Sequence, residues 1–571
     1  MLPTSSLFLF AIFSLTSPAW FISAPSPPQL PSQTCASTLY PKLCRSILST
    51  YRSSPHNPFD YGEFSVKQCL KQARRFSKAI DYYLFHRKQR SRMTHLEIGA
   101  LDDCRELMEL NVEYLETIST ELKMAESFSN ELVERITSFL SGIVTNQQTC
   151  WDELVETKSG VVNAIYAPMS NGTKLYSVSL GLVTHSLNQK LKHKRKEGSE
   201  SHQGRGSTTS AVRVPLETLI KALRKSSCES LSSCSRRRER RLADLEGNGI
   251  LINDTVIVSS SGADNFTSIG DAVAFAPNNT IPEAGYFVIY VREGYYYEYV
   301  NAPKHKKNIM LIGDGINRTV ITGNHSVIDG WTTFNSSTFA VSGERFLAVD
   351  VTFRNTAGPE KHQAVAVRNN ADISTFYRCS FEGYQDTLYV HSLRQFYRDC
   401  HIYGTVDFIF GNAAAVFQSC HLYARKPLAN QKNAFTAQGR TDPNQNTGIS
   451  IHNCTIEAAP DLAMDLNSTF SYLGRPWKLY SRTVYMQSYI DKVISPVGWL
   501  EWNGTVGLDT LYYGEFQNYG PGANTSMRVR WPGYTLMNAT QAMNFTVYNF
   551  TMGDTWLPQT DIPFSGGLLA T

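Results

Sequence analysis

The sequence predicts two folded domains of different class, a helical bundle followed by an all-β domain of stacked coils. Three observations carry this prediction. Apolar residues recur at spacings of three and four in the first part of the chain. Short Val, Ile and aromatic-rich segments, bounded by Gly, Asn or Asp, fill the second part. Four cysteines in similar contexts recur there at two nearly equal intervals and a longer third one, which is typical of a repeating architecture.

The N-terminus predicts a secretory signal peptide over residues 1–24. An apolar run from Leu7 to Ile22 precedes small residues and prolines, although no basic residue comes before it. The alternative is an uncleaved membrane anchor, for which the run is short. Eleven cysteines and fourteen Asn-x-Ser/Thr sequons also favour secretion. The predicted glycosylation sites are Asn171, Asn253, Asn265, Asn278, Asn317, Asn324, Asn335, Asn453, Asn467, Asn503, Asn524, Asn538, Asn544 and Asn549.

Residues 30–185 predict a small up-and-down helical bundle. The segment 101–115 places five apolar side chains on one helical face, and glycine is scarce throughout the region. Cys35 and Cys44 could clip a hairpin, and Cys104 and Cys150 could tie two helices together. The alternative is that these cysteines are small core residues, but the secreted context favours disulfides.

Residues 186–246 predict a disordered basic linker, rich in charge, Ser and Gly. Residues 190–241 contain 15 basic and 5 acidic side chains, whereas residues 243–571 carry a net charge of about −6. Because the basic excess is confined to one stretch, charge gives no reason to expect nucleic-acid binding. The run Arg-Arg-Arg-Glu-Arg-Arg is either a solvated segment or a processing site for a protease, near residues 240–243.

Residues 249–571 predict the β domain. The cysteines at 379, 400, 420 and 454 suggest that each repeat is one turn of a parallel β-helix. Equivalent residues on neighbouring turns would then lie about 4.8 Å apart. Asp386 and Asp407 are separated by the same interval as Cys379 and Cys400. Gln363 precedes Gln385 by an interval only one position longer, so these polar side chains are expected to stack on one face.

Stacking gives the two aspartates different protonation states. At about 5 Å and an effective dielectric near 20, two carboxylates repel by roughly 3 kcal/mol, or about two pKa units. One of them is therefore expected to keep its proton beside an ionised neighbour. The alternative is that Asp386 and Asp407 belong to separate structural turns and that Gln363 and Gln385 form an amide ladder.

A protonated and an ionised carboxyl side by side fit ester hydrolysis or glycoside cleavage. Two glutamine amides favour the ester, because they can donate hydrogen bonds to an oxyanion. Arg475 could hold an ionised carboxylate, and Trp477 offers a flat face to a sugar ring. The alternatives are a surface ion pair and a core aromatic.

Several segments resemble, in order and spacing, those of plant pectin methylesterases, also called pectinesterases: GYYYE, HQAVAV, GYQDTLYV, GTVDFIFGNAAAVFQ and YLGRPWKLYSRTV. The resemblance covers most of residues 250–571. Residues 30–185 resemble the inhibitor-like pro-region of one class of these enzymes, and residues 240–243 resemble its processing motif, with Ala where Leu is common. The fold implied is an all-β right-handed parallel β-helix catalytic domain, preceded by an all-α four-helix-bundle pro-domain.

The resemblance implies a role for each polar residue of the stack. Asp407 matches the nucleophile that attacks the C6 methyl ester of a galacturonate. Asp386 matches the acid that protonates methanol and then the base that activates water. Gln363 and Gln385 match the oxyanion donors, and Gln363 also contacts substrate.

Three further residues match substrate or positioning contacts. Arg475 matches the residue that orients the nucleophile and keeps it ionised, and it also contacts substrate. Trp477 and Thr333 match sugar contacts. The resemblance also leads to two predicted disulfides in the second domain, Cys379–Cys400 and Cys420–Cys454.

The reaction implied needs no metal or organic cofactor. Its substrate is methylesterified homogalacturonan, and the product is de-esterified pectin and methanol. Expected partners are the pro-domain, external inhibitor-like proteins and a processing protease, with no nucleic acid. We expect a secreted monomer in the cell wall, with the pro-domain as a folding aid or internal inhibitor.

Two rival functions stay open from the sequence. The first is a pectin lyase or polygalacturonase, although a lyase would need a cluster of carboxylates for Ca²⁺ that the sequence does not show. The second is a catalytically silent wall-binding or inhibitor protein, which only the N-terminal domain supports.

Overall fold

A computed structural model of the chain describes residues 31–51, 58–124, 129–158, 160–194, 212–225 and 249–570. The predicted signal peptide at 1–24 and the predicted processing site at 240–243 lie outside these ranges. Within them, no helix is both apolar enough and long enough to cross a bilayer.

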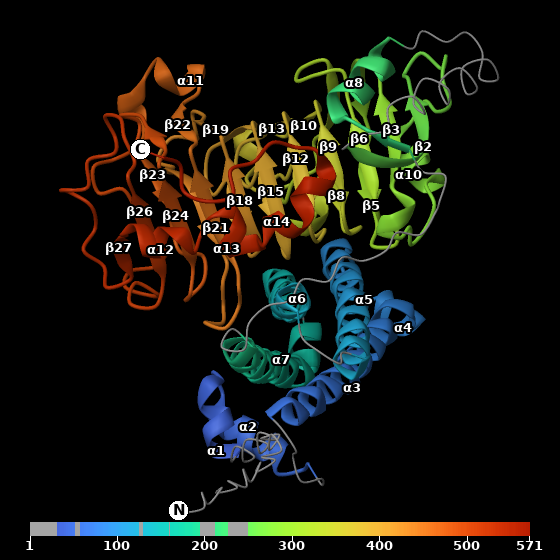
Figure 1. The fold of residues 1–571 in the computed structure, drawn as a ribbon, viewed down its shortest axis with the longest axis vertical. Coiled ribbons are helices and arrows are strands. Elements are labelled where there is room, and N and C mark those ends of the chain that lie inside the picture. Colours follow the sequence, from blue (N-terminus) through green and yellow to red (C-terminus); the bar gives the residue numbers. More distant parts are fainter. Residues whose placement is uncertain are drawn as a thin grey trace, which may run out of the picture.

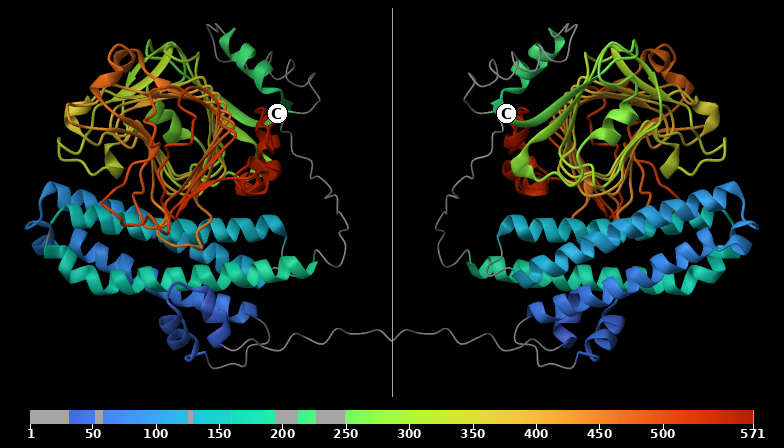
Figure 2. Two further views of the ribbon diagram at one scale, coloured as in Figure 1. Left: turned by 90° about the vertical axis from the view of Figure 1, so that its left-hand side faces the viewer. Right: turned by 90° about the vertical axis from the view of Figure 1, so that its right-hand side faces the viewer.

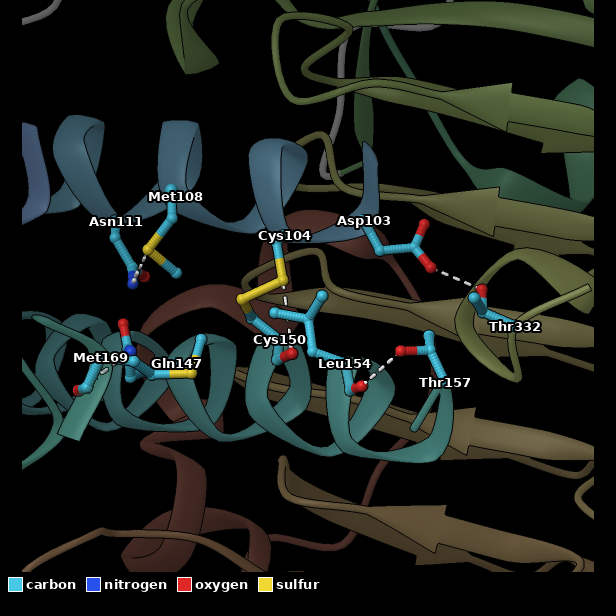
Figure 3. The surroundings of a disulfide bond; sticks show 10 residues. All are labelled: Asp103, Cys104, Met108, Asn111, Gln147, Cys150, Leu154, Thr157, Met169 and Thr332. Carbon is cyan, nitrogen blue, oxygen red and sulfur yellow. Dashed lines mark hydrogen bonds between the residues drawn. A yellow bond between two sulfur atoms is a disulfide. The ribbon is translucent and has the colours of Figure 1, made fainter. Parts of the chain in front are cut away.

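The N-terminal half is the predicted helical bundle. Four long antiparallel helices pack around a core of apolar side chains, and shorter helices precede and join them (Figure 1). The long helices are α3 (Pro58–Phe85), α5 (His95–Met124), α6 (Asn130–Glu156) and α7 (Gly160–Lys194). The shorter ones are α1 (Pro31–Thr34), η1 (Cys35–Ser37), α2 (Pro41–Leu48) and α4 (Arg87–Arg90). The predicted disulfides Cys35–Cys44 and Cys104–Cys150 are both present, and the second joins α5 to α6 (Figure 3).

The second half is a parallel β-helix with three sheets, as predicted. Each full turn adds one strand to each sheet, so that strands adjacent in a sheet come from consecutive turns. Apart from the antiparallel β1–β2 pair, every pairing between named strands is parallel. Figure 2 shows the coil end-on, with the helical bundle along one side. Inward-facing Val, Ile, Leu and Phe side chains fill its interior.

The strands are as follows. The first sheet contains β1 (Val212–Val214), β2 (Ile250–Val258), β3 (Tyr286–Val291), β6 (Ile309–Ile312), β9 (Leu347–Val349), β12 (Ser374–Tyr377), β15 (Arg394–Arg398), β18 (Ala414–Gln418), β21 (Gly448–His452), β24 (Arg482–Met486), β26 (Tyr512–Phe516) and β27 (Tyr534–Leu536). The second contains β4 (Gly294–Tyr297), β7 (Thr319–Gly323), β10 (Thr352–Asn355), β13 (Ser380–Glu382), β16 (His401–Gly404), β19 (His421–Ala424), β22 (Thr455–Ala458) and β25 (Tyr489–Ile490). The third contains β5 (Val300–Ala302), β8 (Phe339–Val341), β11 (Val367–Asn369), β14 (Leu388–Val390), β17 (Ile409–Gly411), β20 (Asn433–Gln438) and β23 (Ser471–Gly474). Short helices α10 (Ile269–Phe275), α11 (Pro460–Ala463), α12 (Ala539–Met543), α13 (Val547–Thr551) and α14 (Gly553–Trp556) cover parts of the coil.

The sharp corner between the first and second sheets depends on one left-handed residue per turn. A positive φ turns the chain sharply within a single residue. L-residues adopt this backbone conformation only where the surrounding structure enforces it. The corner residues and their φ values are Asp350 (59°), Arg378 (51°), Asp399 (51°), Ser419 (56°), Asn453 (56°) and Gln487 (49°). Because this corner recurs at the same place in each turn, the residues that follow it form a column inside the coil.

The cysteine column corrects two predicted disulfides. The structure contains neither Cys379–Cys400 nor Cys420–Cys454, and all four residues are buried free thiols. Strand register places the four in one column, and the backbone N–H of Cys420 donates to the sulfur of Cys454 at 3.3 Å. Each thiol donates a hydrogen bond to a backbone carbonyl at 3.3–3.6 Å instead. A bridge would have to give up these bonds and rotate the side chains along the column.

The predicted disordered linker, 186–246, also needs correction. Helix α7 continues into it as far as Lys194, β1 pairs with β2, and α8 (Leu216–Arg224) packs its apolar side on the β-helix. Leu216, Leu219, Ile220 and Leu223 form that apolar side. These residues recur at helical spacing, but the basic composition around them concealed the pattern.

Candidate active site

The two aspartates lie together at the corner between the second and third sheets. Asp386 precedes β14 and Asp407 precedes β17, and the register of these strands pairs Leu388 with Ile409, which places Asp386 directly opposite Asp407. Both have left-handed backbones, with φ of 64° and 54°. Both side chains are almost completely buried. The stacking predicted from the interval that the aspartates share with Cys379 and Cys400 is therefore found in the structure.

Arg475 clamps one carboxylate of the pair. It follows β23, and its Nε and Nη2 donate to the two carboxylate oxygens of Asp407, each at 2.7 Å. The Trp502 ring lies against the guanidinium, 4.4 Å from its carbon to the ring centroid. A bidentate contact of this kind fixes the orientation of the carboxylate as well as favouring its ionised form.

The two carboxyls differ in how strongly they hold a proton. Burial raises the pKa of Asp386 well above its usual value, and the neighbouring charge of Asp407 raises it further. Burial also raises the pKa of Asp407, but Arg475 opposes that effect through charge and hydrogen bonding. Asp386 is thus the carboxyl that keeps a proton, and Asp407 the one that ionises, as a close pair of acids requires.

The glutamines align at the same corner. Asp386 pairs with Asp407, and its backbone N–H donates to the carbonyl of the residue before Asp407, Val406, at 3.1 Å. In the same way, the backbone N–H of Ala364 donates to the carbonyl of Gln385 at 3.2 Å, so Ala364 pairs with Asp386. Gln363 therefore lies opposite Gln385, one turn earlier. The extra position in the glutamine interval is absorbed nearby, because the Thr387 carbonyl accepts from both Ala366 and Val367, at 2.8 and 3.3 Å. Both glutamine side chains are partly exposed.

A row of aromatic residues extends the site across the third sheet. Tyr389 and Phe410 follow the two aspartates at the same spacing, and their rings stack at 4.1 Å between centroids. Trp477 meets Phe410 edge-on at 6.1 Å. Sequence reasoning singled out Trp477 but missed the other two and Trp502. The repeated spacing in Asp-Thr-Leu-Tyr and Asp-Phe-Ile-Phe could have indicated the stacked pair.

The helical bundle covers this face of the β-helix. Asp103 of α5 accepts a hydrogen bond from Thr332 at 2.5 Å (Figure 3), and Glu153 of α6 accepts one from the backbone N–H of Phe334 at 3.2 Å. Lys478, next to Trp477, forms an ion pair with Asp152 at 2.8 Å. The predicted substrate residue Thr333 lies between the first two contacts.

Apolar and charged contacts both contribute to the covered face. Tyr389, Phe410 and Phe334 belong to one apolar cluster with buried residues of α3, α5 and α6. Asn335, a predicted glycosylation site, donates its side-chain N–H to Asp103, so a glycan on that nitrogen would remove the contact. Glu156 at the end of α6 is close enough to raise the pKa of Asp386 slightly further.

The fold and the site together define a β-helix enzyme of the carboxylic ester hydrolase class, with two stacked, buried aspartates at the candidate site. A family model described as Pectinesterase matches residues 255–554. A second, described as Plant invertase/pectin methylesterase inhibitor, matches residues 29–182. The chain therefore belongs to the pectinesterase family, in the form that joins an inhibitor-like domain to the catalytic domain.

Individual proteins give the same result. The chain is 65% identical over 548 residues to "Probable pectinesterase/pectinesterase inhibitor 25" of Arabidopsis thaliana, which covers 95% of this chain and 87% of that protein. It is 46% identical over 472 residues to "Pectinesterase/pectinesterase inhibitor PPE8B" of Prunus persica, with 82% of each chain covered. Among solved structures, "Pectin methylesterase from Carrot" matches with a TM-score of 0.54 and 54% identity, over 55% of this chain and 98% of that one.

Proposed function

We propose that the β-helix domain hydrolyses the C6 methyl esters of galacturonate in pectin, with Asp407 as nucleophile and Asp386 as general acid and base. The observation that carries this proposal is the bidentate Arg475 clamp on one of two stacked, buried carboxyls. Arg475 fixes the orientation of the Asp407 carboxylate and favours its ionised form, whereas burial favours the protonated form of Asp386.

The reaction proceeds in two halves. A carboxylate oxygen of Asp407 attacks the ester carbonyl carbon, and the side-chain amides of Gln363 and Gln385 donate to the oxyanion that forms. As the intermediate collapses, the bond to the methoxy group breaks and Asp386 transfers its proton to the departing methanol. Asp386 then takes a proton from water, whose oxygen attacks the acyl-enzyme and releases the Asp407 carboxylate and a galacturonic acid, which gives its proton to solvent.

The residues around the aspartates serve the polysaccharide. Trp477 presents a ring to a sugar, and Thr333 and Arg475 contact neighbouring groups. The glutamines are partly exposed even with the bundle docked, and its release would open the rest of the site to a polymer. Secretion to the pectin-rich wall agrees with this substrate, and we propose that the chain acts there as a monomer after proteolytic processing.

We further propose that the helical bundle is an autoinhibitory domain. The contacts of Asp103, Asp152 and Glu153 lie on the loops and sheet that border the aspartates. In this arrangement Tyr389 and Phe410 are buried beneath the bundle and Trp477 is partly covered. External inhibitor-like proteins would bind the same face after the bundle is released.

Methanol release measured against new reducing ends tests the proposed reaction. A protease site placed within residues 195–211 of the full chain would separate the bundle while leaving β1 and α8 on the β-helix. After the bundle is removed, we expect methanol from methylesterified pectin and no new reducing ends. Reducing ends without methanol would assign the domain to the polygalacturonases, and neither product would favour a silent wall-binding protein.

The pro-domain interface is expected to weaken as pH rises. Burial raises the pKa of Asp103 to about 7 and that of Glu153 well above its usual value. An undocked carboxyl has a pKa of about 4, so the docked state binds more protons. Docking is then strongest below about pH 4 and weakens as pH rises toward 7, by up to tenfold per unit for each group. Methanol release by the uncut chain should increase over that range.

The double variant Asp103→Asn, Glu153→Gln provides the check on this pH dependence. It keeps side chains that can hydrogen-bond to Thr332 and Phe334 but removes both titrations. Affinity of the bundle for the β-helix, measured by isothermal calorimetry, should then vary little between pH 4 and 7. Glu131→Gln, at the exposed start of α6, is the matched control and should keep the pH dependence of the unaltered chain. An unchanged pH dependence in the double variant would contradict the assignment.

A further inference from the structure

The outward side of helix α3 carries a row of basic residues that lie outside the apolar core of the bundle. Lys67, Lys71, Arg74, Arg75 and Lys78 follow one another at helical spacing, and all five are exposed. At 1.5 Å per residue the row is about 16 Å long. These side chains and Leu70 line one shallow depression on the surface. The opposite side of α3 supplies the apolar side chains that hold the bundle together.

Part of this positive charge is not neutralised by neighbouring carboxylates. Arg74 and Lys78 border a second hollow that contains the carboxylates of Asp81, Glu109, Glu113 and Glu116, so the uncompensated charge is centred on Lys71 and Arg75. Lys67 pairs with Glu63 at 2.7 Å and Arg74 with Glu116 at 2.6 Å, but these are exposed pairs that contribute little. Within the described ranges, Lys71, Arg75 and Lys78 have no ion pair. A row of this kind attracts a linear polyanion, because each bound carboxylate releases counterions from the polymer.

Two exposed aromatic rings continue the same side of the helix. Tyr82 and Phe85 lie one and two helical turns beyond Lys78, and their exposed fractions are 50% and 61%. Large apolar side chains left this exposed indicate an interaction surface when they adjoin other ligand-binding groups. Flat rings bind the apolar faces of sugars, whereas the basic row binds carboxylates. A polymer that offers both is an acidic polysaccharide.

We propose that the α3 outer face, formed by Lys71, Arg74, Arg75, Lys78, Tyr82 and Phe85, binds de-esterified homogalacturonan. The identity of this ligand rests on the proposed function, since the polyuronate is the product of that reaction. Methylesterified pectin lacks the carboxylates and binds this face weakly. The face therefore distinguishes the product of the catalytic domain from its substrate.

The position of α3 allows binding while the active site is covered. Helices α5 and α6 lie against the β-helix, and α3 lies in the layer farther from it (Figure 2). The uncut chain can thus be retained on wall regions that are already de-esterified. After cleavage and release, the bundle remains there, which lowers its concentration near substrate that is still esterified.

The test is retention of the full chain on pectate and on highly methylesterified pectin over a series of salt concentrations. The triple variant Lys71→Glu, Arg75→Glu, Lys78→Glu should lower affinity for pectate about tenfold or more at low salt and reduce the salt slope. Tyr82→Ala, Phe85→Ala should also lower affinity while leaving the salt slope unchanged. Thermal unfolding of each variant should match the unaltered chain, since all five residues are exposed.

The matched control changes the same net charge elsewhere. Lys221, Lys492 and Arg530 are exposed on the β-helix side of the molecule, and their triple replacement by Glu should leave pectate retention nearly unchanged. Equal losses in the control and the α3 variant would overturn the proposal, as would retention on phosphatidylserine vesicles in preference to pectate. All binding is measured in the Asp407→Asn background, so that it does not depend on catalysis. Absence of methanol release by the chain with Asp407 would contradict only the proposed function. Unchanged pectate retention in the α3 variant would contradict only this inference.

Discussion

Replacing Asp407 by asparagine is expected to reduce methanol release about 10⁴-fold or more, because the side chain that forms the acyl bond is lost. The measurement uses the chain cut within residues 195–211 and freed of its bundle. Asparagine keeps the shape and accepts the left-handed backbone at this position. Binding of pectin oligomers should therefore survive. The KM should change little compared with kcat.

Asp350→Asn separates the loss of a nucleophile from the loss of an ion pair. Asp350 also has a left-handed backbone, with φ of 59°, and Arg378 binds it with both Nε and Nη2, at 2.8 and 2.9 Å. It lies beside α8, on the side of the coil away from the bundle (Figure 1). Both variants should lower thermal stability, but Asp350→Asn should retain full activity. Comparable losses of activity in the two variants would show that Asp407 is structural.

The stacking of the two aspartates could be predicted from the sequence because, in a β-helix, residues separated by one repeat lie on neighbouring turns at a fixed distance. Asp386 and Asp407 are separated by the same number of residues as Cys379 and Cys400. The repeat length recognised from the cysteines therefore also predicted that the aspartates stack on neighbouring turns. Gln363 and Gln385 also lie on neighbouring turns although their interval is one residue longer. The sequence does not show why: the extra residue is accommodated where the Thr387 carbonyl accepts two backbone hydrogen bonds.

The same repeat led to the wrong disulfides. Register correctly placed four cysteines in one column, but proximity along a column does not set the direction of the side chains. Strand β1 and helix α8 were missed for a different reason. Their sequence is short and lies in a basic stretch that conceals the helical spacing of the apolar residues in α8. They are ordered by packing on β2 and on the apolar outer surface of the first sheet.

The docking of the bundle on the face of the β-helix that carries the two aspartates could not be predicted from the sequence. It depends on complementary surfaces formed by segments that are far apart in the chain. Leu393 shows this most clearly. It has a left-handed backbone, with φ of 68°, and its side chain is buried in the core cluster of the bundle. Gly142 of α6 makes room for it, because a Cβ at that glycine would lie 2.9 Å from Leu393 Cδ2.

Gly142→Phe is accordingly expected to activate the uncut chain. A phenyl ring at this point collides with Leu393, and overpacking of this kind costs about 1–3 kcal/mol, which weakens docking roughly 5- to 150-fold. In the free bundle Leu393 is gone and the nearest remaining atom is Tyr114 Cε2, at 3.8 Å from the added Cβ, and loss of a mid-helix glycine favours the helix. Methanol release before cleavage should rise, whereas release after removal of the bundle should match the unaltered chain.

Gly160→Phe adds the same ring where a Cβ meets nothing within 4 Å, so it should leave the uncut chain inhibited. If Gly142→Phe is no more active than Gly160→Phe, the covered face does not limit access to Asp407, and the bundle is not an inhibitor.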